Sequence, residues 1–255
     1  MDRETMAVEA ARAGAAVAAD LFRTSLDVET KASVTDYVTE ADTGAQRRIV
    51  ERIEETYPAD AVVGEEGDAR KHLREGETAW VIDPIDGTTN YVRGLPVWAT
   101  SVAAVVDSDP VAAVNYLPAM ETEYRAGTEG TTRDGEATGV STETALAASV
   151  VAPTLRYGRG DDDHRRMLST LSSAVGDVRR LGSAQTALSL VADGRIDAAV
   201  GVGSAHPWDT VAGVHLIRRA GGTVTDLAGD PWTPRSEGLV ASGGGIHDDL
   251  LALLR

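Results

Sequence analysis

Two aspartates follow directly on an apolar run in the stretch "DPIDGTTN", residues 83–90. The run, residues 79–82, predicts a buried strand, so Asp83 and Asp86 are expected together at its end. Two like charges so close cost free energy unless a cation lies between them. Gly87 and Thr88 then begin a tight turn into an expected helix, whose backbone N–H groups can bind an anion such as phosphate. The stretch predicts a site for a cation and a phosphate.

Three further acidic groups stand where elements are expected to begin or end, namely Asp42 in "DYVTEAD", Glu65 in "GEE" and Asp209 in "HPWDTVAG". Each acid taken alone could simply cap a helix or complement its dipole. Four such groups beside a phosphate-binding turn favour a shared function. The chain has no cysteine and five scattered histidines, so carboxylate oxygens predominate among the candidate ligands. Such oxygens suit hard cations, above all Mg²⁺.

Nucleophilic alternatives fit the sequence less well. Phosphatases of the haloacid dehalogenase type carry D-x-D-G-T after an apolar strand near the N-terminus, whereas Pro84 stands two residues before Asp86, a third of the way along the chain. No G-x-S-x-G occurs, and a cysteine nucleophile is excluded. These nucleophile schemes therefore lack support in the sequence.

Helical and strand patterns alternate along the chain without an obvious linker. Residues 1–145 predict an α+β half with most of the acids, and residues 146–255 an α/β half that contributes Asp209; together, 1–255 form one catalytic unit. Helices are expected at 6–21, from Asp42 as N-cap to Pro58, and at 164–174, 185–192, 208–220 and from Ile246. Strands are expected at 61–63, 79–82, 100–107, 110–116, 122–126, 149–152, 178–181, 196–200, 223–226 and 239–241.

The charge is strongly negative, with a formal net charge of −16. Such a surface repels nucleic acids and anionic membranes, so neither is an expected partner. Lys31 and Lys71 are the only lysines among 24 basic residues. The spread of the acids is typical of a salt-adapted surface and suggests a halophilic source. No signal peptide or membrane span is visible, which favours a cytoplasmic protein.

The motifs together resemble the inositol monophosphatase family, which is related to fructose-1,6-bisphosphatases and 3′-phosphoadenosine 5′-phosphate phosphatases. Four motifs match in the family's order: "DYVTEAD" (36–42), "GEE" (64–66), "WVIDPIDGTTNYVRGLP" (80–96) and "PWDTVAG" (207–213). Lys31 also fits a position that the family commonly keeps. The resemblance, of archaeal type, implies a layered α/β/α/β/α sandwich and a homodimer.

The resemblance also implies roles for individual residues. A first Mg²⁺ would be held by Glu65, Asp83 and the Ile85 carbonyl, a second by Asp83, Asp86 and Asp209, and a weaker third with help from Glu65. Asp42 and Thr88 would orient the attacking water. The substrate phosphate ester would contact Asp86, Gly87, Thr88, Ser183, Ala184 and Asp209.

The substrate stays open among sugar and polyol phosphates. Inositol-selective members carry a glutamate seven residues before the aspartate of "WD", where this chain has Val202 or, counted forward from "GRID", Gly201. Fructose 1,6-bisphosphate, inositol 1-phosphate or both are expected. A 3′-phosphoadenosine 5′-phosphate phosphatase is a weaker alternative, because "DYVT" stands in place of "SPVT". A catalytically dead regulatory relative is another, although none of the expected acids is missing. Arginines 156, 159, 179 and 180 could bind a second phosphate, but each alone is more simply a surface residue.

Overall fold

The computed structural model describes residues 1–24, 28–30, 37–154 and 162–255. Lys31, Arg156 and Arg159 lie outside these ranges. Within them, no helix combines the length and the apolar character needed to cross a membrane.

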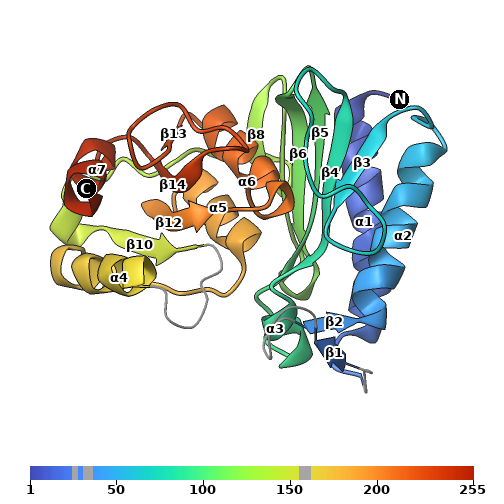
Figure 1. Cartoon of the computed structure of the whole chain (residues 1–255), viewed down its shortest axis with the longest axis horizontal. Coiled ribbons are helices and arrows are strands. Elements are labelled where there is room, and N and C mark those ends of the chain that lie inside the picture. The colour runs from blue at the N-terminus through green and yellow to red at the C-terminus, as the bar shows by residue number, and fades with distance from the viewer. Residues whose placement is uncertain (25–27, 31–36, 155–161) are drawn as a thin grey trace.

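Five layers form the molecule (Figure 1). Helices α1 (Arg3–Leu21) and α2 (Glu40–Glu54) cover one face of a seven-stranded sheet. Helices α5 (Ala184–Ala192) and α6 (Pro207–Arg219) lie between that sheet and a five-stranded sheet. Helices α4 (Asp162–Ala174) and α7 (His247–Leu254) cover the outer face of the second sheet. This arrangement confirms the α/β/α/β/α sandwich expected from the sequence.

The seven-stranded sheet has the order β3-β4-β5-β6-β7-β8-β9, with β3 parallel to β4 and the other pairs antiparallel. Its strands are β3 (Ala61–Gly64), β4 (Ala79–Asp86), β5 (Ala99–Val106), β6 (Asp109–Leu117), β7 (Thr122–Gly127), β8 (Gly130–Arg133) and β9 (Glu136–Ala137).

The second sheet has the order β11-β10-β12-β14-β13, in which β10 runs parallel to β11 and β12. Its strands are β10 (Val150–Pro153), β11 (Asp177–Val178), β12 (Ala198–Ser204), β13 (Thr223–Thr225) and β14 (Glu237–Ser242). A separate antiparallel pair joins β1 (Val28–Thr30) and β2 (Tyr37–Thr39), and the short helix α3 (Thr88–Val92) follows β4.

Strand β4 is buried along its whole length because helices cover both faces of its sheet. Trp80 and Ile82 pack toward α1 and α2, whereas Ala79 and Val81 pack into the central layer with α5 and α6. Burial on both faces explains why the sequence shows a continuous apolar run rather than an alternating one.

The start of α2 corrects one expectation. Thr39 is the N-cap, and its hydroxyl accepts a hydrogen bond from the Ala41 N–H at 3.1 Å. Asp42 is instead the third helical residue, and its carboxylate accepts from the Thr39 N–H at 2.8 Å. The expectation that Asp42 caps this helix is therefore wrong, because a threonine three residues earlier completes a capping box with it.

Candidate active site

A bulge in β4 brings Asp83 and Asp86 to the same side of the strand. Residues three apart on a regular strand point to opposite faces. Here Asp83 pairs with Ser101 and Asp86 with Ala99, so β4 has one residue more than β5 over this stretch. Pro84 lies inside the bulge, and its carbonyl accepts a hydrogen bond from the Thr100 hydroxyl at 2.8 Å. The extra residue re-aims the second carboxylate toward the first.

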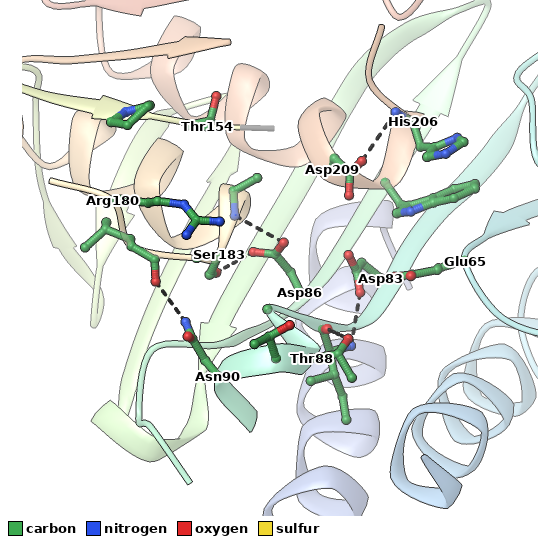
Figure 2. A pocket seen from close by; sticks show the side chains of 18 of the residues that line it. Glu65, Asp83, Asp86, Thr88, Asn90, Thr154, Arg180, Ser183, His206 and Asp209 are labelled. Atoms are coloured by element: carbon green, nitrogen blue, oxygen red, sulfur yellow. Dashed lines mark hydrogen bonds between the residues drawn. The ribbon is translucent and has the colours of Figure 1, made fainter. Parts of the chain in front are cut away.

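Asp209 of α6 joins these two aspartates, as Figure 2 shows. One carboxylate oxygen from each of the three residues lies within 4.8 Å of the others. Burial, together with the negative charges of Glu65, Asp86 and Asp209, raises the pKa of Asp83 well above its usual value. Burial also raises the pKa of Asp86 to about 6. The protein thus holds carboxylates where their ionised forms are disfavoured, and a cation would relieve that cost.

The N-terminal end of α5 holds Asp86 in place. Its carboxylate accepts hydrogen bonds from the Ser183 hydroxyl, from the Gln185 N–H at 2.7 Å and from the Ala184 N–H at 3.2 Å. These bonds lower the pKa of Asp86 and partly offset the effect of burial. Ser183 and Ala184, expected as substrate contacts, line the pocket and bind Asp86.

Gln185 positions the helix that carries Asp209, a role that sequence reasoning missed. This side chain is fully buried; its amide group donates to the Trp208 carbonyl at 2.6 Å and accepts from the Gly213 N–H at 2.8 Å. Asn115 of β6 also donates to it, at 2.9 Å. A glutamine within the apolar helix pattern of residues 185–192 was the available signal.

Thr88 and Asp42 form a second polar group at the rim of the acidic cluster. The Thr88 hydroxyl lies 3.5 Å from Asp42 Oδ1 and 3.1 Å from the Ile85 carbonyl oxygen. Burial raises the pKa of Asp42 to about 7. The negative charges of Glu66 and Glu65 also raise this pKa, whereas hydrogen bonds from Thr39 lower it. Asp42 can therefore exchange a proton near neutral pH.

Glu65 lines the same pocket but stands outside the close group of three aspartates. The residue after it is clamped by Gln46 of α2. Gln46 donates to the Glu66 carbonyl at 2.6 Å and accepts from the Glu66 N–H at 2.8 Å. The clamp fixes the loop that presents Glu65 and was not foreseen from the sequence.

Gly87 makes the turn from β4 into α3 with a φ of +94°. A Cβ atom there would come within 3.0 Å of the Ser183 Cβ and 3.1 Å of the Gly182 carbonyl oxygen. Both the backbone conformation and the close approach of the Gly182–Ser183 segment therefore require glycine.

The pocket has a volume of about 670 Å³. Besides the acids, its lining includes Thr89. Asn90, Thr154 and Arg180 also line it (Figure 2). Arg179 is not among the described residues that line the pocket, and it pairs with Asp177 at 2.5 Å. Gly201 and Val202 are not among the described residues that line the pocket.

His206 and Trp208 form one wall of the pocket. Their rings stack with centroids 4.5 Å apart and an interplanar angle of 8°. His206 is exposed and its backbone N–H donates to Asp209 at 3.3 Å, whereas Trp208 is only 5% exposed. The wall therefore supports the helix end that carries Asp209.

Comparisons with known proteins agree on one family. The model for the family described as "Inositol monophosphatase family" matches residues 2–255. A fructose-1,6-bisphosphatase/inositol-1-monophosphatase of Thermotoga maritima is 35% identical over 89% of this chain and 86% of its own. The inositol-1-monophosphatase ImpA of Mycolicibacterium smegmatis is 34% identical over 86% of this chain and 80% of its own. The Nus factor SuhB of Salmonella typhimurium is 32% identical over 98% of this chain and 95% of its own.

A solved structure with the same fold is that of the Thermotoga maritima inositol monophosphatase TM1415. It aligns with a TM-score of 0.89 and 31% identity, over 100% of this chain and 97% of the other. The likeness covers all five layers described above.

Proposed function

Since this chain belongs to the inositol monophosphatase family, we propose that its acidic pocket hydrolyses phosphate monoesters of small sugars or polyols with bound Mg²⁺. The carrying observation is the group of three aspartates, two of them buried with raised pKa values, whose oxygens lie within 4.8 Å of one another. Such a group is costly in a folded protein unless it serves to bind a cation.

The donor set fits hard divalent ions. Carboxylate and carbonyl oxygens are the ligands that Mg²⁺ prefers. One ion would be held by Glu65, Asp83 and the Ile85 carbonyl and another by Asp83, Asp86 and Asp209, with a third weaker position beside Glu65. When bound, the ions would lower the pKa of water and neutralise charge on the leaving oxygen.

The protein's own groups would orient and deprotonate the nucleophile. The Thr88 hydroxyl lies 3.5 Å from Asp42 Oδ1, so it could take a proton from water while passing its own proton to the Asp42 carboxylate. The raised pKa of Asp42 suits a proton acceptor near neutral pH. Gly87 and Thr88 would offer their N–H groups to the phosphate. Asp86, held by α5, would keep a fixed orientation throughout.

A phosphate-release assay tests this function directly. The purified protein is assayed with inositol 1-phosphate, fructose 1,6-bisphosphate and 3′-phosphoadenosine 5′-phosphate, with Mg²⁺ or with EDTA. Release that requires Mg²⁺ supports the proposal. No release from any of the three, by protein shown to bind Mg²⁺, would favour a regulatory role instead.

Substrate choice follows from the missing acid. Neither Gly201 nor Val202 can accept a hydrogen bond from a ring hydroxyl through its side chain, and an apolar contact discriminates by only ~1–3 kcal/mol. We expect kcat/KM for fructose 1,6-bisphosphate to be at least comparable with that for inositol 1-phosphate at saturating Mg²⁺ and high salt. Arg180 in the pocket lining would favour a second phosphate. A preference for inositol 1-phosphate above ~100-fold, about 2.7 kcal/mol, would contradict this.

The family resemblance and the net charge of −16 also underlie a proposal on assembly and location. We expect a cytoplasmic homodimer that is adapted to high salt and binds neither nucleic acids nor membranes. Light scattering across a range of KCl concentrations measures the mass. A monomer throughout that range would contradict the dimer.

A further inference from the structure

Lys71 places its ammonium group inside a cluster of backbone carbonyls. Its Nζ atom lies 3.0 Å from the Gly64 oxygen, 2.9 Å from that of Glu65, 3.4 Å from that of Glu66 and 3.2 Å from that of Gly67. These four successive residues form the loop that leaves β3 and presents Glu65 to the pocket. One positive charge thus binds the backbone carbonyls of the first part of this loop.

The choice of lysine is informative in this chain. The chain has only two lysines among its 24 basic residues, so most of its positive side chains are arginines. An ammonium is a compact charge with three hydrogens that four converging oxygens can share, whereas the planar guanidinium directs five hydrogens in a fixed fork. The carbonyl cluster therefore suits lysine and not arginine.

Lys71 also contacts the opposite wall of the pocket. Its Nζ lies 5.7 Å from the centre of the Trp208 ring, within the range of a cation–π contact. Trp208 precedes Asp209, and its carbonyl is bound by Gln185. A single side chain therefore links the backbone of Glu65, in the loop after β3, to the start of α6.

We propose that Lys71 is a positioning residue for the metal site, a resident cation whose carbonyl cluster fixes Glu65 relative to Asp209. This inference rests on the proposed metal-dependent function. It also predicts that the loop without the ammonium leaves carbonyl oxygens that a free monovalent cation can bind, as carbonyl rings do in potassium channels.

The experiment measures Mg²⁺ affinity by calorimetry and kcat in the intact chain. Lys71→Ala removes the ammonium, and Lys71→Arg keeps the charge but changes its shape. We expect both variants to bind Mg²⁺ at least ~10-fold more weakly, as is typical when groups that orient metal ligands are lost. Arg74→Ala, which removes an exposed cation from the same segment, is the matched control and should leave the Mg²⁺ affinity unchanged.

Replacing NaCl by NH₄Cl at equal ionic strength should restore at least ~3-fold of the lost affinity in Lys71→Ala, because ammonium can occupy the carbonyl cluster. It should restore none in Lys71→Arg. Wild-type Mg²⁺ affinity in either lysine variant, or no response of Lys71→Ala to ammonium, would overturn the inference. If circular dichroism shows Lys71→Ala unfolded, Lys71→Arg alone decides. Failure of the unmodified protein to bind Mg²⁺ would instead refute the proposed function.

Discussion

Replacing Asp86 by asparagine should lower kcat by at least ~100-fold, about 2.7 kcal/mol on the barrier. The substitution removes a negative charge from a proposed ligand of the second ion. It also turns one oxygen into an NH₂ group, which would face the Ala184 N–H if the remaining oxygen keeps its bonds to Ser183 and Gln185. Steady-state kinetics with Mg²⁺ titrated to saturation measure the effect.

The fold should survive this change. One hydrogen bond is lost, at a cost of about 0.5–1.5 kcal/mol. The neutral amide, however, removes the cost of burying a charge and the repulsion from Glu65, which together raise the pKa of Asp86 to about 6. Urea denaturation of the metal-free protein should show the free energy of unfolding within about 1 kcal/mol of wild type.

Ser183→Ala is the matched control. It leaves the Asp86 carboxylate intact and removes one of its three donors, so we expect a loss of kcat well under that of Asp86→Asn. Equal losses in the two variants would mean that Asp86 acts through its hydrogen bonds rather than through its charge. Unchanged kcat in Asp86→Asn would remove Asp86 from the catalytic site.

The metal-free protein should lose at least about 1 kcal/mol of stability between pH 6.5 and 8.5. Burial raises the pKa of Asp42 to about 7 and that of Asp86 to about 6, and it raises the pKa of Asp83 as well. A group whose pKa is higher in the folded state stabilises the fold fully below its unfolded pKa of ~3.9 and loses this contribution as pH rises through the folded value. The free energy of unfolding therefore declines as the pH rises.

Two histidines set the lower limit, pH 6.5, of the range over which this decline is expected. Burial lowers the pKa of His215 to about 4 and also lowers that of His247. Their contributions are present above the ordinary histidine pKa of ~6.5 and are lost as pH falls, so below that value they oppose the aspartates. Above it, the carboxylates dominate the change.

Urea denaturation in EDTA at constant salt measures this dependence. With saturating Mg²⁺ the decline should disappear, since bound ions stabilise the ionised carboxylates and the folded state together. Asp42→Asn should flatten the metal-free curve in part. A free energy of unfolding that stays level or rises from pH 6.5 to 8.5 in EDTA would contradict the raised pKa values.

The sequence predicted those parts of the site that depend on neighbouring residues. The apolar run before Asp83 predicted a buried strand, and β4 does end at Asp86. The motif around Asp209 predicted a helix start, and α6 begins two residues earlier. Both signals are local, because the strand, the turn and the helix are each encoded within about ten residues.

Contacts between distant segments could not be read in this way. The donors to Asp86 lie 97 to 99 residues further along the chain, and Gln46 binds Glu66 across 20 residues. Polar side chains at such positions read as ordinary helix residues until the layers are assembled. The short strands β8 and β9 were also missed, because their four and two residues give too little periodicity.

The bulge in β4 has a consequence for how this site can vary between related proteins. The two aspartates share a side because three steps along β4 match two along β5. The side chain of Ile85 packs in a cluster with Tyr91 and Trp98 and can be exchanged for another apolar group of similar size. Deleting Ile85 would instead restore a regular ladder, with Asp86 still opposite Ala99, and would remove the carbonyl oxygen that accepts a hydrogen bond from the Thr88 hydroxyl at 3.1 Å. The site should therefore tolerate substitution here far better than any change in length.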